Sequence, residues 1–273
     1  MKALKFSIPK KYLTVVKNEI QRQLAFRFDI FSYRIGNLFE LIAQIIIWSV
    51  IFKNVEVVRG YTYPEMISYI IIGWLIVYLT GNYGLENRVE GHIFEGKITE
   101  FLIKPISYLK YIVFFCLGRL SLAFISAIFI QAIIIILYHN IIIFNLNVGA
   151  VLILLGMLVA TFILKLFIAI ALGMVAFWTD RIVGIDYSFN VLYKFFSGAY
   201  FTLALLPPFA LTICKFLPFA YTFYFPIQLY LGKISVFEGL KALGIEILWI
   251  FILYGIIKLM WKRGVKKYEG VGI

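Results

Sequence analysis

The segment that decides the fold is Gly84–Lys110, GLENRVEGHIFEGKITEFLIKPISYLK, a polar stretch inside an otherwise apolar chain. It carries four glutamates and four basic residues, Arg88, Lys97, Lys104 and Lys110, and is therefore nearly neutral. A segment of mixed charge suits a protein partner better than a lipid surface. We expect residues 84–110 to form a cytoplasmic loop at which another protein docks.

The same segment contains an incomplete phosphate-binding pattern. Residues 91–97 read GHIFEGK, but Ile98 follows where the pattern requires the Ser or Thr that holds magnesium. A working phosphate loop also follows a buried strand of a soluble α/β domain, whereas this segment lies between two apolar runs. We expect no nucleotide to bind here, so any ATP and magnesium would be bound by another chain.

The composition is that of a membrane protein. Of 273 residues, 63% are hydrophobic and 15% are charged, and the mean hydropathy is +0.95. Soluble domains are only about half apolar, so the sequence predicts an all-α polytopic membrane protein. The net charge of +12 indicates topology rather than nucleic-acid binding, because Lys and Arg accumulate on the cytoplasmic side of membrane proteins.

Apolar runs predict six transmembrane helices within a membrane domain that extends over residues 35–261. The fourth run is too long for one upright helix, so we expect tilt or a break there. Pro64 and Glu65 mark the start of the second helix. The six predicted spans are residues 35–52, 66–83, 111–137, 148–178, 191–206 and 243–260.

The distribution of basic residues predicts the orientation. With the N-terminus inside, the cytoplasmic segments carry 17 Lys and Arg: eight before the first span, four in the central loop, one after the fourth span and four in the tail, residues 262–273. The outside segments carry five. This bias places both ends in the cytoplasm. About thirty mostly polar residues precede the first span, so no signal peptide is expected.

The N-terminal region, residues 1–34, is expected to contain an amphipathic helix within residues 9–28. Apolar residues recur there at helical spacing, with lysines and arginines on the other face. Such a helix lies in the membrane interface, although a helix packed on a partner protein is the alternative. The apolar positions are Leu13, Val16, Ile20 and Leu24.

Prolines interrupt the apolar sequence before the last span. Four of them, Pro207, Pro208, Pro218 and Pro226, fall within twenty residues, and proline breaks a helix interior. We therefore expect residues 207–240 to form an outer segment with short re-entrant helices, which enter the outer leaflet and are shielded by protein.

Six charged residues fall inside or at the ends of the predicted spans, among them Lys194 and Lys258. The four singled out as intramembrane charges, on a substrate path or in structural pairs, are Glu40, Arg119, Lys165 and Glu246. An unpaired charge in the hydrocarbon costs about 2.5–3.5 kcal/mol or more. Depth counted from the cytoplasmic ends pairs Lys165 with Glu246, and Arg119 with Glu40. The alternative is that Lys165 faces a substrate path and meets an anionic headgroup.

Little in the chain indicates catalysis or metal binding. His92 and His139 are isolated, and no cluster of His, Cys, Asp and Glu has metal-ligand spacing, so we expect no metal site. Cys116 and Cys214 lie in apolar runs, as small buried hydrophobic residues do. Without paired acidic motifs an integral membrane enzyme is disfavoured. An ion-driven secondary transporter and a non-transport membrane subunit remain alternatives.

Two stretches resemble a known family. EGKITEFLIKPIS, residues 95–107, looks like a G-x-(I/L)-x-x-x-L-(I/L)-x-P loop. FFSGAYFTLALLPPF, residues 195–209, and LPFAYTFYFPIQLYLG, residues 217–232, resemble the segment before the last span. Both features are similar to those of permease subunits of ABC-2 type ABC transporters, in particular the bacterial six-span branch. The resemblance covers nearly the whole chain.

The resemblance implies a permease subunit of an ATP-driven exporter in the bacterial plasma membrane. It would pair with a second permease, identical or related, and with a dimer of cytoplasmic ABC ATPases that bind ATP and magnesium, while this chain binds no cofactor. Its other contacts would be with membrane lipid and not with nucleic acid. The prolines of the outer segment would belong to a gate. The residues implied in coupling to the ATPase are Gly91, Phe94, Gly96, Phe101, Leu102, Lys104 and Pro105.

Overall fold

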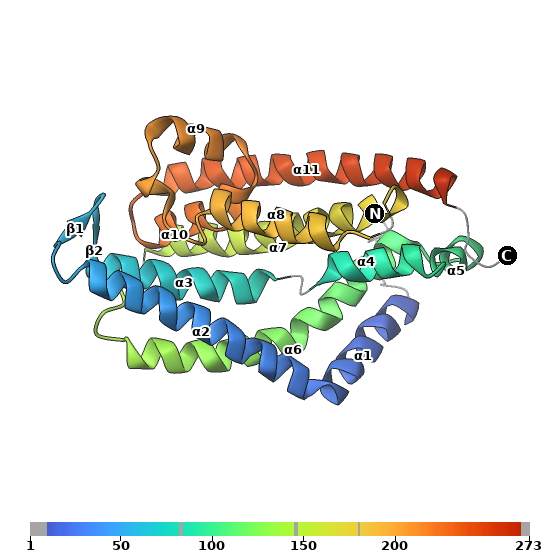
Figure 1. Ribbon diagram of the computed structural model, residues 1–273, viewed down its shortest axis with the longest axis horizontal. Coiled ribbons are helices and arrows are strands. Elements are labelled where there is room, and N and C mark those ends of the chain that lie inside the picture. The colour runs from blue at the N-terminus through green and yellow to red at the C-terminus, as the bar shows by residue number, and fades with distance from the viewer. Residues whose placement is uncertain (1–9, 82–83, 145–146, 180, 269–273) are drawn as a thin grey trace, which may run out of the picture.

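The computed structural model describes residues 10–81, 84–144, 147–179 and 181–268. Long helices run side by side along its longest axis (Figure 1). Parts of the predicted N-terminal region, second span and tail (residues 1–9, 82–83 and 269–273) lie outside the described residues. The expected all-α polytopic membrane fold is confirmed, with one small β-hairpin in the described part of the chain that the hydropathy pattern did not predict.

The elements follow one another in this order. The first half contains α1 (Lys10–Ala25), α2 (Arg27–Ile51), β1 (Val57–Val58), β2 (Tyr61–Thr62), α3 (Tyr63–Thr80), α4 (Leu85–Phe94), α5 (Ile98–Ile103) and α6 (Tyr108–Leu137). The second half contains α7 (Val148–Met174), the 3-10 turn η1 (Val175–Phe177), α8 (Val183–Ser197), η2 (Leu203–Leu205), α9 (Pro208–Phe216), η3 (Phe219–Thr222), α10 (Tyr224–Tyr230) and α11 (Val236–Lys267).

Four helical segments within the described residues are long and apolar enough to cross a membrane. They are Tyr63–Phe94, which takes α3 and α4 together, Tyr108–Leu137, Val148–Phe177 and Val236–Lys267. The apolar part of α2, Ile35–Ile51, is shorter. These segments make the chain a multi-pass membrane protein, while the count of six spans stays a prediction.

Local sequence explains where two of these helices begin and end. A capping box formed by Thr62 and Glu65 starts α3, with proline in its first turn, as the Pro64–Glu65 signal predicted. The long fourth span does not continue as one regular helix, because α7 passes into the 3-10 turn η1 after Met174. This turn ends the helix rather than breaking it, so the tilt or break expected for the fourth span stays a prediction.

The bounds predicted for the fifth span, residues 191–206, are wrong. The helix there, α8, begins eight residues earlier at Val183 and ends at Ser197, because Gly198 adopts a left-handed φ of 88° that terminates it. The apolar residues that follow form a turn and η2, in which Leu203 is fully buried. Leu203 is thus buried by the protein without a membrane-spanning helix, while most of its neighbours in residues 199–206 are half-buried.

The proline-rich segment forms the short helices α9 and α10, joined by η3, as predicted. Pro208 and Pro226 each stand in the first turn of a helix, and Pro218 directly precedes η3. Proline is tolerated there because the N–H it lacks has no partner within the helix. In Figure 1 these helices and the hairpin lie at one end of the molecule, and α4 and α5 lie at the other.

Helix α1 packs along α6 near the α4 end. The rings of Tyr12 and Phe114 stack with centroids 5.0 Å apart. The apolar positions predicted to form one face are partly or largely exposed, with Leu13 and Leu24 both 51% exposed. The inward face carries Glu19 and Gln23, both buried. The helix thus presents apolar side chains outward, which is the arrangement required at a membrane interface.

Candidate functional site

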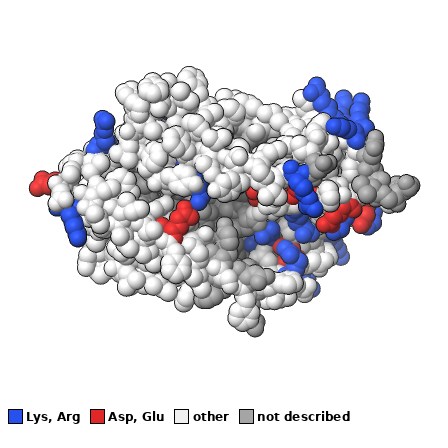
Figure 2. All heavy atoms as spheres, viewed as in Figure 1, with Lys and Arg blue, Asp and Glu red and all other residues white. Residues whose placement is uncertain are grey.

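A cavity of about 950 Å³ lies between α1, α2, α3, α4, α6, α7 and α8. Charged side chains are rare inside membrane proteins and mark functional paths when they face a shared cavity. Figure 2 shows charged residues gathered at the end that carries α4 and α5, with a smaller group on the middle of the same face. The charged residues lining the cavity are Arg22, Glu40, Glu86, Arg119, Lys165, Asp186 and Lys194.

Lys165 of α7 lines this cavity and is only 8% exposed. Its ammonium donates a hydrogen bond to Thr80 Oγ1 at 3.1 Å and interacts electrostatically with Glu246. Glu246 of α11 is fully buried and accepts a hydrogen bond from Thr161, one turn before Lys165, at 2.7 Å. The predicted partners Lys165 and Glu246 therefore lie close to each other. Lys165 lines the cavity, and Glu246 does not.

The predicted pairing of Glu40 with Arg119 is wrong. The Glu40 carboxylate of α2 forms an ion pair with Lys194 of α8, with Nζ 3.0 Å from Oε1. Counting depth along each helix ignores the rotation of the helix about its own axis, so it did not identify Lys194, which lies inside the predicted fifth span, as the partner of Glu40. This ion pair joins two helices that both line the cavity.

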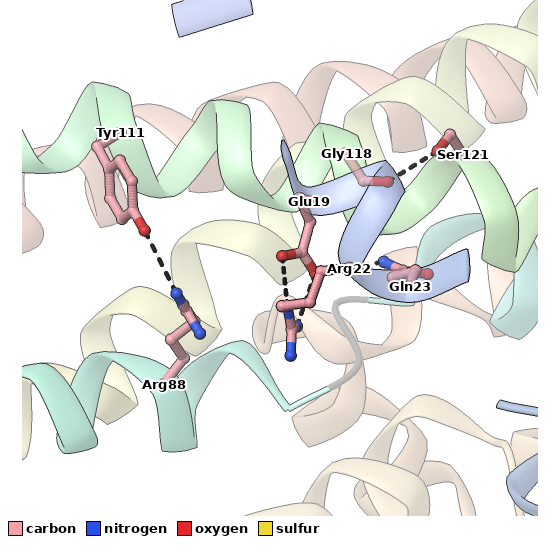
Figure 3. Close-up of polar contacts among 7 residues, drawn as sticks. All are labelled: Glu19, Arg22, Gln23, Arg88, Tyr111, Gly118 and Ser121. Carbon is pink, nitrogen blue, oxygen red and sulfur yellow. Dashed lines mark hydrogen bonds and ion pairs between the residues drawn. The ribbon is translucent and has the colours of Figure 1, made fainter. Parts of the chain in front are cut away.

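Arg119 instead belongs to a group of three arginines contributed by α1, α4 and α6. It interacts electrostatically with Glu19, Arg22 and Arg88. Arg22 makes two hydrogen bonds to Glu19, both of 2.8 Å, and Arg88 donates one to the Tyr111 hydroxyl at 3.3 Å. Figure 3 shows the Arg22 and Arg88 side chains directed into the space between α1, α4 and α6.

The segment predicted as a polar loop contains two helices, and one face of α4 is part of the core. Leu85, Val89 and Ile93 are buried, and α4 packs closely on α7. Gly173 of α7 makes this approach possible, because a Cβ at that position would lie 2.5 Å from Val89 Cβ. Helix α4 is thereby attached to the helix that carries Lys165.

The residues expected to contact an ATPase differ in their surroundings. Phe94 and Leu102 are exposed at 46% and 50%, but the Phe101 ring packs in an aromatic cluster, 5.0 Å from Tyr108 and 4.8 Å from Tyr111. Ile103, which is not among the residues expected to couple to the ATPase, is 78% exposed. The sequence of residues 101–103, FLI, does not show which side chain faces outward. Helix α5 has only six residues, which is too short for the periodicity of apolar positions to define a buried face.

The remaining predicted residues shape this segment. Gly96 has a φ of 75° and forms the turn between α4 and α5, while Gly91 lies within α4. The Lys104 ammonium hydrogen-bonds Glu100 at 2.6 Å and lowers the pKa of that carboxyl. The Pro105 carbonyl accepts a hydrogen bond from Lys11, which connects the end of α5 to α1.

Replacing Phe101 should therefore affect folding, and replacing its neighbour should not. Phe101→Ala is expected to lower the free energy of unfolding by about 1–3 kcal/mol, because it removes ring contacts in the aromatic cluster. Leu102→Ala, at a half-exposed position, should change it by less than about 0.5 kcal/mol. Thermal unfolding of the two variants in detergent measures the difference. Equal midpoints would show that Phe101 does not hold α5 in place.

Comparison with known proteins agrees with this architecture. The family model described as ABC-2 family transporter protein matches residues 38–272, from within α2 to beyond the end of α11. No curated protein sequence matches the chain. The family match includes the α4–α5 segment, the proline-rich helices and the cavity lining from Glu40 onward, and it covers most of the sequence. The chain therefore belongs to the ABC-2 family of transporter proteins, as an ABC-2 type permease.

Proposed function

We propose that this permease is the membrane subunit of an ATP-driven exporter in a bacterial plasma membrane. It works with a second permease, identical or related, and with two cytoplasmic ATPase subunits that bind ATP and magnesium. The chain itself performs no catalysis. Both of its ends and the α4–α5 segment are on the cytoplasmic side, and the hairpin and the proline-rich helices are on the outer side.

The observation that carries this proposal is the exposed apolar surface of the α4–α5 segment. Phe94, Leu102 and Ile103 are all exposed by nearly half or more, beside the charged residues Glu95, Lys97 and Lys104. Apolar anchors with a polar rim are typical of a protein docking surface. Their position after the second membrane helix supports the α4–α5 segment as the contact with the ATPase.

The packing of α4 on α7 supports a path from the ATPase to the cavity. A movement of α4 reaches α7 directly, because Val89 and the Glu86 backbone lie against Gly173. Lys165 lies about two turns before Gly173 on the same helix and faces the cavity. Closure of the ATPase subunits on ATP is thus transmitted through packed helices rather than through a flexible loop.

Affinity purification from the native membrane tests the proposal. The tagged chain is extracted in mild detergent, and the subunits that accompany it are identified by mass spectrometry and assayed for ATP hydrolysis. We expect recovery of a phosphate-loop ATPase. A folded chain recovered repeatedly without such a subunit, from membranes that contain the ATPase, would contradict the proposal and favour an ion-driven carrier.

A further inference from the structure

The three arginines Arg22, Arg88 and Arg119 form what we call the arginine cluster. The guanidinium carbons of Arg22 and Arg88 lie 5.9 and 4.0 Å from the centroid of one ring, that of Phe115. Arg119 interacts electrostatically with both. Like charges held this close repel one another unless a counter-charge is present. The cluster therefore favours the binding of an anion.

The nearby carboxylates of Glu19 and Glu86 do not fully balance the positive charge of the arginine cluster. Glu19 is engaged by two hydrogen bonds from Arg22, and Glu86 interacts with Arg119 only through space. Arg88 Nε is buried without an acceptor, and Arg119 forms no hydrogen bond or ion pair with any residue that the structure describes. A buried N–H group without an acceptor is costly, and both Arg88 and the half-buried Arg119 therefore have N–H donors that a ligand can satisfy.

The cavity beside the cluster has two kinds of wall. Arg22 and Arg119 line it together with the amide side chains of Gln23 and Asn87, which also donate hydrogen bonds. The rest of its lining includes large apolar side chains, among them Trp74, Val77, Ile168, Leu172, Phe189 and Phe223. A cavity with a basic polar part and an apolar part matches a molecule with one charged end and one apolar end.

We propose that the arginine cluster binds the anionic headgroup, a phosphate or a carboxylate, of an amphipathic molecule whose apolar part occupies the cavity. This assignment of a substrate class rests on the proposed function. The planar guanidinium fork matches the oxygens of phosphate and carboxylate groups. Cationic amphiphiles are rejected, because the headgroup would meet a surplus of positive charge.

Binding of three probes to the purified full chain, with the subunits it retains, tests the proposal. The probes are dodecyl phosphate, dodecyltrimethylammonium and inorganic phosphate, titrated in a neutral detergent while the shift of the thermal unfolding midpoint is followed. We expect dodecyl phosphate to bind at least about tenfold more tightly than the other two. Equal binding of the cationic probe, or of inorganic phosphate, would overturn the proposal.

Variants locate the site. Arg119→Met should weaken dodecyl phosphate binding by about tenfold, and Arg22→Gln should do the same if the first variant fails to fold. Arg263→Met removes the same charge from an exposed side chain near the end of α11 that does not line the cavity, and it should leave binding unchanged. Unaltered binding in folded Arg119→Met and Arg22→Gln would contradict the assignment.

The source of the headgroup is distinguished in nanodiscs. If phosphatidylglycerol in a phosphatidylcholine bilayer competes with dodecyl phosphate, the ligand is a membrane lipid, and if it does not, the ligand is another anionic amphiphile. Both results support the site. ATP hydrolysis by the retained subunits is measured in the same samples. A complex that hydrolyses ATP but does not bind the anionic probe would contradict the headgroup site and leave the proposed function standing.

Discussion

Gly173→Ala should destabilise the protein and uncouple ATP hydrolysis from transport, although the change adds a single methyl group. The new Cβ would lie 2.5 Å from Val89 Cβ and 2.6 Å from the Glu86 carbonyl oxygen, so α4 must move away from α7. Overpacking of this kind costs about 1–3 kcal/mol. We expect a lower thermal unfolding midpoint, together with loss of substrate-stimulated ATP hydrolysis in the assembled transporter.

Gly255→Ala is the matched control. Gly255 lies in the middle of α11, and a Cβ there meets no atom within 4 Å. Alanine is the better helix former, so this variant should be more stable by about 0.5–1 kcal/mol. The two variants therefore shift the unfolding midpoint in opposite directions. A shift of the same sign in both would show that the close contact between α4 and α7 does not stabilise the protein.

The double variant Leu102→Glu with Ile103→Glu should abolish assembly with the ATPase while leaving the chain folded. Both side chains are at least half exposed, so neither supports the core. In a docked complex each would be an apolar anchor, and losing an anchor costs about 2 kcal/mol or more, roughly 30-fold in affinity. Co-purification of the ATPase, quantified against wild type, measures the effect.

A substitution at an exposed apolar position far from the α4–α5 segment provides the control. Phe129 of α6 is 70% exposed but lies on a membrane helix away from the α4–α5 segment. Phe129→Tyr changes an equally exposed aromatic side chain there and should leave recovery of the ATPase unchanged. Retention of the ATPase by the Leu102→Glu, Ile103→Glu variant at the wild-type level would place the docking surface elsewhere.

Hydropathy and proline positions were sufficient to predict most of the architecture. The apolar runs located α3, α6, α7 and α11 because these helices are hydrophobic over most of their length. Prolines correctly predicted short helices before α11, since proline fits only the first turn. The start of α8 could not be located from hydropathy. Polar residues such as Asp186 and Asn190, which line the cavity, lower the hydropathy of its first half.

The site was harder to predict than the fold, for a physical reason. Sequence gives the depth of a charged residue along a helix but not the direction in which it points, so Glu40 was assigned to Arg119 rather than to Lys194. The sequence does not indicate the contribution of Glu19 and Arg22 from α1, because an amphipathic helix is expected to lie at the membrane surface. Contacts between helices distant in sequence depend on packing, which periodicity alone does not contain.

The most direct test of the central claim, that the α4–α5 segment docks a cytoplasmic ATPase, is cross-linking from Ile103 in native membranes. A photoreactive phenylalanine analogue is placed at position 103, and at Phe129 for comparison. Our account predicts a covalent product with a phosphate-loop ATPase from position 103 and none from position 129. Absence of that product from position 103 in folded protein, or equal yields from both positions, would contradict the account.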